Sequence, residues 1–307
     1  MEFVGENGVD AGGLSRDMLS AFWENAYCNL FDGGSLLSPA MHPTSELTSF
    51  SAIGKILSHG YMVTGFLPVR IAYPSLASIL IGSSVIIPDP LLLRTFESSI
   101  SCHEASIVRD ALSVKGDRFS STLLSRLISL LGRYGCREVP TPEKLRQIIV
   151  KITHYEYQIK PLAGIAAIRS GIPMEHLTFW NRFTAEKLYS IVVAMCADPS
   201  KVIDALFSET KNEVEERVFT YLQQFIASMN QDMLRRFLRF VTGSSVFTAN
   251  EITVIYNSSS GLARCPIAHT CTCTLELPVS YETYGIFVHE FEAILSDTLY
   301  VWRIDFT

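Results

Sequence analysis

One short segment concentrates the reactive side chains of this chain. Three of the seven cysteines and one of the seven histidines fall within Cys265-Pro-Ile-Ala-His-Thr-Cys-Thr-Cys273. The thiolate is the nucleophilic form of cysteine, and a neighbouring imidazole can lower the pKa of a thiol or move its proton. His269 stands two residues before Cys271, in a stretch that we expect to be an exposed loop. A nucleophilic cysteine at position 271 is therefore one interpretation of this segment.

A zinc site is the second interpretation. Cys265, His269, Cys271 and Cys273 supply four possible ligands within the same segment. Tetrahedral zinc sites usually combine two ligand clusters from separate segments, and the sequence holds no second cluster.

Simple packing is the third interpretation and the default for any free cysteine, because free cysteine is among the most buried residue types. We assign the four remaining cysteines to the core, since apolar residues surround most of them: Cys28, Cys102, Cys136 and Cys196. These residues alone leave the three interpretations of residues 265–273 open.

Composition excludes several classes of protein. The 25 Lys and Arg against 31 Asp and Glu give a net charge of −6, whereas nucleic-acid binders need clustered basic residues. The longest uncharged stretch, residues 71–88, is broken by Pro74 and Gly82 and is too short to span a membrane. An odd cysteine count without a basic N-terminal leader argues against secretion. We therefore expect an intracellular protein in a reducing compartment, with no nucleic-acid or membrane partner.

The elements that must position residues 265–273 follow from apolar spacing. Most of the chain before residue 208 repeats apolar residues at helical intervals, and Ser15 is a candidate cap of the first helix. Residues 252–256 and 274–279 are predicted strands on either side of the cysteine segment, and residues 284–295 a final helix. The length of 307 residues suggests about two domains at roughly 150 residues each. The polar residues 208–217 are the predicted linker, with a solvated helix face as the alternative.

Four motifs in order resemble HECT-type ubiquitin ligases. Ala268-His-Thr-Cys271, followed by Leu275-Glu-Leu-Pro278 and Tyr281, is similar to the family's active-site signature. The other three motifs are Phe3–Arg16, which resembles FxGExGxDxGGxxRE, residues 50–57 with Gly65 and Leu67-Pro68, and Arg236–Ser244, which resembles FLxFVTG. The variant Cys271-Thr-Cys273 most resembles the branch of cell-cycle-phase-specific ubiquitin ligases.

The resemblance implies a bilobal α+β fold. A mostly helical N-lobe would occupy residues 1–212, and a smaller mixed α/β C-lobe with the catalytic cysteine would occupy residues 213–307, joined by a hinge. The family docks the conjugating enzyme on a small N-lobe subdomain with strands. Here the matching stretch, about residues 97–160, reads as short and helical, so we expect a reduced subdomain. The helical segment and strand that usually precede the opening motif in the family are missing, which indicates an N-terminally truncated fragment or a reduced form.

The resemblance also implies a function. Cys271 would accept ubiquitin from a ubiquitin-conjugating enzyme as a thioester and pass it to a lysine of a protein substrate. Thr270 would support the loop, and His269 would either assist proton transfer or pack in the loop. No cofactor or metal is implied, and the expected location is the cytoplasm or nucleus. The alternative is a catalytically inactive HECT-like module that only binds proteins.

Overall fold

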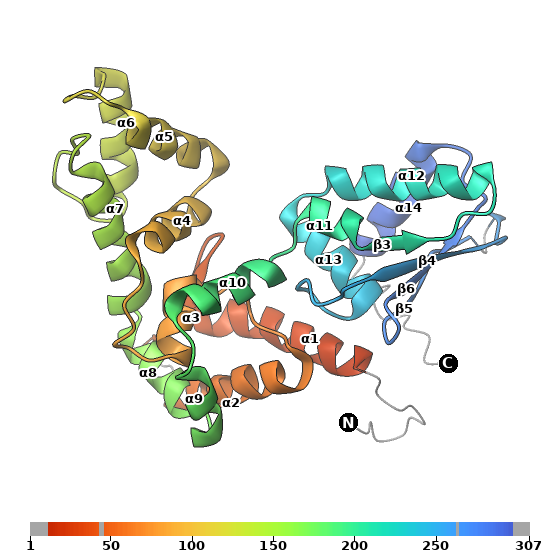
Figure 1. The fold of residues 1–307 in the computed structure, drawn as a ribbon, viewed down its shortest axis with the longest axis horizontal. Helices are drawn as coiled ribbons and strands as arrows, with labels where there is room; N and C mark the ends of the chain where they lie inside the picture. The colour runs from red at the N-terminus through yellow and green to blue at the C-terminus, as the bar shows by residue number, and fades with distance from the viewer. Residues whose placement is uncertain (1–11, 43–45, 262–263, 297–307) are drawn as a thin grey trace. The chain divides into compact units, whose positions relative to one another are not determined.

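The computed structural model describes residues 12–42, 46–261 and 264–296 (Figure 1). The predicted strand near Phe3 and most of the opening motif lie outside the described residues. Contacts divide the chain into two compact units. We name residues 25–59 and 68–192 the helical unit, and residues 1–24, 60–67 and 193–307 the sheet unit. Helices predominate and strands are fewer, so the predicted α+β fold class is confirmed.

The helical unit consists almost entirely of helices. The first four helices of the chain either cross the boundaries of this unit or lie in its first half. These are α1 (Gly13–Leu30), α2 (Leu47–Thr64), α3 (Tyr73–Leu80) and α4 (Asp89–Ser99). The remaining helices are α5 (Cys102–Ser113), α6 (Ser121–Gly132), α7 (Leu145–His154), the π-helix η1 (Tyr155–Ile159), α8 (Leu162–Ser170), α9 (Met174–Trp180) and α10 (Ala185–Met195). A small antiparallel pair, β1 (Phe31–Gly33) and β2 (Leu37–Pro39), completes the unit.

Residues 97–160 form a helical group with its own core. Every residue of this stretch is described, and it contains helices but no strand. Leu127, Leu131 and Ile149 are fully or almost fully buried in the cluster that α4 to α7 share. The predicted helical character is present, whereas the docking of a partner here stays a prediction.

The sheet unit places a four-stranded mixed sheet against helices (Figure 1). Its elements are α11 (Pro199–Asp204), β3 (Leu206–Ser208), α12 (Glu213–Ser228), α13 (Gln231–Thr242), β4 (Ile252–Asn257), β5 (Ile267–His269), β6 (Thr274–Pro278) and α14 (Tyr284–Ser296). The strand order is β3-β4-β6-β5, in which β4 is parallel to β3 and β6 while β5 runs antiparallel to β6. Phe225, Phe237 and Phe291 stack in the core between the helices.

The polar stretch 208–217 starts at the end of β3 and continues into a helix. Asn212 caps α12 by accepting from the backbone N–H groups of Val214 and Glu215. The acidic residues of its first turn suit the positive end of the helix dipole. Residues 213–217 therefore belong to a helix, as the alternative interpretation of this stretch proposed. The lobe boundary at 212/213 stays a prediction.

Two local predictions are wrong. Ser15 does not cap the first helix, because α1 already begins at Gly13 and the Gly12 carbonyl accepts its first bond, from Arg16 N–H at 3.1 Å. Among the cysteines assigned to the core, Cys28 and Cys102 are exposed and the other two are half-buried. Neighbouring apolar residues in sequence point to other faces of a helix, so they do not bury a cysteine beside them.

No helix within the described residues is long and apolar enough to cross a lipid bilayer.

Candidate functional site

The predicted cysteine loop is a tight hairpin between β5 and β6. His269 pairs with Thr274, so the loop consists of residues 270–273. The Thr272 N–H donates to the His269 carbonyl at 3.2 Å and closes the turn. Cys273 ends it with φ +52°, a left-handed conformation that non-glycine residues adopt only rarely. The hairpin thus presents Cys271 as its second loop residue.

Cys271 is the one exposed thiol of residues 265–273. Cys265 and Cys273 are half-buried. Burial raises the pKa of the Cys273 thiol, while the Arg16 guanidinium acts in the opposite direction. The Cys273 sulfur lies 3.9 Å from the carbonyl of Thr270, toward which it donates. Cys271 is therefore the better placed of the three sulfurs to meet a large partner.

Thr270 anchors the loop from inside the fold. The residue is 2% exposed, and its carbonyl accepts from Arg16 Nη2 at 2.7 Å. A Cβ atom built on Gly13 would lie 2.8 Å from Thr270 Oγ1, which shows how closely α1 approaches the loop. The side chain of Thr270 is therefore inside the fold, and its role in supporting the loop and in catalysis stays a prediction.

His269 faces a carboxylate on the neighbouring strand. Its Nε2 lies 3.4 Å from Glu276 Oε2, and Glu276 Oε1 accepts from Asn257 Nδ2 at 2.9 Å. A carboxylate beside one ring nitrogen orients an imidazole. This row of polar groups crosses β4, β6 and β5 and ends two residues from Cys271.

The first two turns of α1 bind the cysteine loop and the end of α13. We name Gly13, Arg16, Asp17 and Ser20 the α1 face, because their spacing places them on one side of the helix. Arg16 Nε donates to the Thr242 carbonyl at 2.8 Å. Three motifs that are far apart in the chain, residues 13–20, 239–245 and 269–273, therefore meet within the sheet unit.

Two further contacts fix the α1 face. Arg239 Nε donates to Asp17 Oδ1 at 2.7 Å, in an ion pair whose side chains are only 17% and 10% exposed. Ser20 Oγ donates to the Gly243 carbonyl at 3.1 Å and accepts from the Ser245 N–H at 2.9 Å. Sequence reasoning placed Arg16 and Arg239 in motifs but gave neither a role.

Glycine is required on both sides of this contact. A Cβ on Gly13 would lie 2.9 Å from the Cys271 nitrogen and 3.0 Å from its sulfur. Gly243 has φ +74°, and a Cβ there would lie 2.6 Å from the Gly13 carbonyl oxygen. Such distances are well inside van der Waals contact, so only glycine allows the helix and the two loops to approach this closely.

No cluster of three or more metal-ligating side chains occurs within residues 12–42, 46–261 and 264–296. The Cys and His residues considered as zinc ligands do not form such a cluster there.

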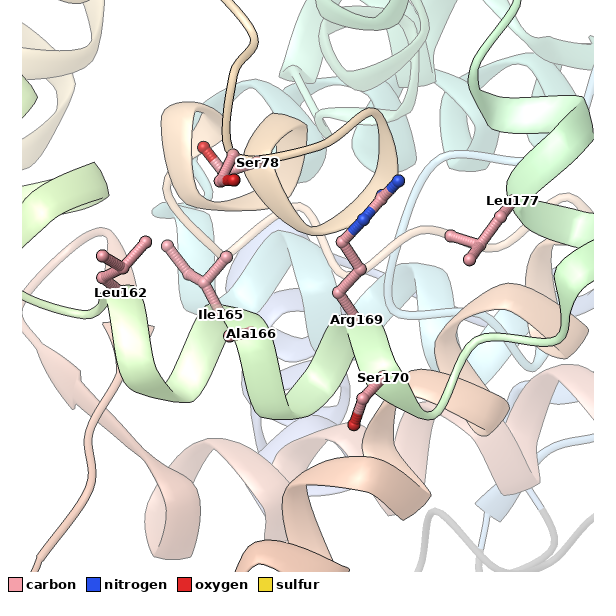
Figure 2. A pocket seen from close by; sticks show the side chains of 8 residues that line it. Ser78, Leu162, Ile165, Ala166, Arg169, Ser170 and Leu177 are labelled. Atoms are coloured by element: carbon pink, nitrogen blue, oxygen red, sulfur yellow. The ribbon is translucent and has the colours of Figure 1, made fainter.

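A cavity of about 360 Å³ lies elsewhere, within the helical unit (Figure 2). Figure 2 shows Ile165 and Arg169 extending from α8 toward it. Arg169 Nη1 donates to the carbonyls of Ile79 and Leu80, each at 2.7 Å, and so caps the end of α3. Burial lowers the pKa of the Arg169 guanidinium. The lining contains serine hydroxyls but no cysteine, histidine or carboxylate, so it offers no thiol to form a thioester and no neighbouring base to activate a hydroxyl.

Comparison with known proteins decides the family. The model of the HECT-domain (ubiquitin-transferase) family matches residues 25–298. This chain belongs to the HECT-domain family. The match includes the hairpin that presents Cys271 and the helices of residues 97–160.

Curated HECT relatives resemble the chain over almost its whole length. A probable E3 ubiquitin-protein ligase TOM1 of Eremothecium gossypii is 25% identical over 92% of this chain and 9% of its own length. The E3 ubiquitin-protein ligase Smurf1 of Drosophila melanogaster is 21% identical over 97% of this chain and 30% of its own length. UPL2 of Arabidopsis thaliana, also an E3 ubiquitin-protein ligase, is 22% identical over 91% and 8% respectively. This chain therefore spans less than a third of the length of these relatives.

Proposed function

We propose that this HECT domain is a ubiquitin-protein ligase that carries ubiquitin as a thioester on Cys271. The observation that supports the proposal most directly is the exposed thiol of Cys271 on a hairpin braced by buried contacts. Family membership and three relatives named as E3 ubiquitin-protein ligases support the same reaction class.

The proposed reaction has two acyl transfers. The Cys271 thiolate attacks the thioester carbonyl of charged conjugating enzyme, and the enzyme's own cysteine leaves as a thiolate. A substrate lysine amine then attacks the new thioester, Cys271 leaves, and the amine loses a proton. Two covalent steps replace one difficult transfer, which is the advantage of nucleophilic catalysis. His269, oriented by Glu276, is the candidate group for moving the proton.

Large partners must reach the same sulfur in turn, which requires moving parts. In the proposal, residues 1–212 act as the N-lobe, residues 213–307 as the C-lobe, and the segment near 208–217 as the hinge. The helices of residues 97–160 would receive the conjugating enzyme. A thiol chemistry of this kind needs free cysteine, so we place the protein in the reducing cytoplasm or nucleus.

A thioester assay tests the proposal. The full chain is mixed with a panel of charged conjugating enzymes, and ubiquitin adducts are separated with and without reducing agent. We expect a reducible adduct with at least one enzyme, its loss in Cys271→Ala and its retention in the matched control Cys273→Ala. Absence of any adduct with folded protein, or loss of the adduct only in Cys273→Ala, contradicts the assignment.

A binding module without catalysis is the second candidate. The observation that favours it is the strand-free helical group at residues 97–160, where the conjugating enzyme is expected to dock. Titration of the folded chain with conjugating enzyme and with ubiquitin separates the two functions. Saturable binding without any thioester supports the binding module.

A further inference from the structure

We propose that Arg16 is the positioning residue of Cys271, because it ties the cysteine loop to the end of α13. The proposal rests on the proposed function, since it assigns Arg16 to the transfer reaction at that sulfur. Arg16 itself does not touch the reacting atoms. It acts through the backbone of Thr270, the residue that precedes Cys271 in the loop.

The guanidinium of Arg16 joins two carbonyls from separate elements. Nε donates to the Thr242 carbonyl at 2.8 Å, and Nη2 donates to the Thr270 carbonyl at 2.7 Å. Thr242 is the last residue of α13, where helix carbonyls have no partner within the helix. Thr270 lies in the hairpin loop, beyond the last paired residue of β5. Hydrogen bonds from a charged donor are shorter and stronger than neutral ones, so the bridge holds the loop firmly in the arrangement described here. Because Arg16 belongs to the proposed N-lobe and the loop to the proposed C-lobe, a movement of the lobes about the hinge would open the bridge.

Arginine suits this bridge better than lysine. The planar guanidinium presents several N–H groups at fixed angles, whereas an ammonium group is a single point on a flexible stem. The helix that carries Arg16 is itself fixed by the Asp17–Arg239 ion pair and by the bonds of Ser20. Arg16 therefore transmits the position of the α1 face and α13 to the loop.

The bridge also constrains the second thiol. Arg16 Nη2 lies 3.9 Å from Cys273 Sγ, and the same sulfur is directed to the Thr270 carbonyl. Thr270 and Cys273, which precede and follow Cys271 in the loop, thus contact the same guanidinium. A misplacement of about 1 Å at a reacting group can slow a reaction about 100-fold, so a loosened loop would show in the rate.

The test compares Arg16→Met and Arg16→Lys with Arg236→Met. Arg236 is the matched control, because its Nη1 also donates to a backbone carbonyl, that of Leu295 at 3.2 Å, away from the cysteine loop. Single-turnover formation of the ubiquitin thioester is measured over a range of charged conjugating enzyme. Hydrogen exchange of the backbone amides of residues 270–273 is measured in the same proteins.

We expect the maximal rate of Arg16→Met to fall about 10-fold to 100-fold. The half-saturating concentration of charged conjugating enzyme should stay unchanged, because the proposed docking site is the helical group of residues 97–160 and not this loop. Arg16→Lys should retain an intermediate rate, and Arg236→Met should keep the wild-type rate. Exchange at residues 270–273 should rise most in Arg16→Met, less in Arg16→Lys and not at all in Arg236→Met. A maximal rate within twofold of wild type, or an equal loss in Arg236→Met, overturns the proposal.

The exchange measurement also separates this proposal from the proposed function. If the wild-type chain forms no thioester, the proposed function fails, and the exchange at residues 270–273 still decides whether Arg16 holds the loop. Unchanged exchange in Arg16→Met overturns the bridge in that case as well.

Discussion

Gly13 is the residue on which the close approach of α1 to the cysteine depends. Any Cβ there would overlap Thr270 Oγ1 and the Cys271 backbone. Alanine is otherwise preferred to glycine in a helix by about 1 kcal/mol, so the contact works against helix propensity. The absence of a side chain at Gly13 therefore allows the contact with the cysteine loop, although it lowers the helix propensity of this position.

We expect Gly13→Ala to lower the free energy of unfolding by about 1 to 3 kcal/mol, as overpacking does, and to slow thioester formation. The matched control is Gly132→Ala in α6, where a Cβ would meet nothing within 4 Å. That variant should be neutral or more stable by up to about 1 kcal/mol. Urea unfolding checks both variants. An unchanged free energy of unfolding in Gly13→Ala would show that the loop moves away from the new Cβ without loss of stability.

Cys273 shows what a sequence pattern leaves out at this scale. The structure shows this residue in the left-handed conformation, at φ +52°, which non-glycine residues adopt only rarely. Spacing alone does not show which of the two thiols, Cys271 or Cys273, is exposed. The turn geometry and the difference in exposure are not local properties of the sequence.

Helix α5 offers an element whose stability should depend on pH. Ser101 and Glu104 form a reciprocal capping box, in which each side chain bonds the other residue's backbone N–H. The hydrogen bonds of Ser101 and the nearby Arg133 guanidinium lower the pKa of the Glu104 carboxyl. A carboxyl with a lowered folded-state pKa stabilises the fold above its unfolded pKa of about 4.3 and loses that contribution as the pH falls.

Glu104→Gln should therefore destabilise the chain by about 0.5 kcal/mol at pH 7, a small value because the pair is near the surface. The melting-temperature difference from wild type should stay nearly constant from pH 7 to about pH 5 and shrink as the pH falls further, through the lowered pKa of Glu104. Thermal melts at several pH values check this, with Ser101→Ala/Glu104→Gln as the double variant for non-additivity. A difference that does not shrink even well below the unfolded pKa of about 4.3 would mean that the Glu104 carboxylate contributes nothing specific.

Most elements could be predicted from periodicity, but their exact ends could not. The strands 252–256 and 274–279 and the final helix were recognisable because their apolar residues recur at fixed intervals. Ser15 was misassigned because cap preference is a local rule, whereas Gly12 and Gly13 begin the helix where it meets the cysteine loop. Tertiary contact thus overrode the local signal.

At the scale of the molecule, the two units have separate cores. Val202 is fully buried with Leu222 and Leu275 in the sheet unit, although it precedes the predicted lobe boundary at 212/213. Leu127 is fully buried among the helices of residues 97–160. The polar composition of residues 208–217 marked a change in the chain. It could not show that β3 pairs with β4 or that Val202 of α11 packs in the core of the sheet unit, because both are non-local contacts.

Val202→Ala should cost about 2 to 3 kcal/mol and raise hydrogen exchange in β4 and β6 while leaving α6 and α7 protected. Leu127→Ala is the reciprocal variant and should expose α6 and α7 alone. Native-state hydrogen exchange by mass spectrometry distinguishes the units. Equal loosening of both units by either substitution would show that they unfold as one.

The convergence of residues 13–20, 239–245 and 269–273 has a pharmacological consequence. Gly13 closes one side of the Cys271 sulfur, while the thiol stays exposed to solvent. An electrophilic inhibitor must then approach the Cys271 sulfur from its solvent-exposed side. A compact electrophile will reach the sulfur, whereas a bulky one will clash with the first turn of α1. Selectivity over other cysteine enzymes would come from the shape of that helix end, where Gly13 places backbone and no side chain beside the sulfur.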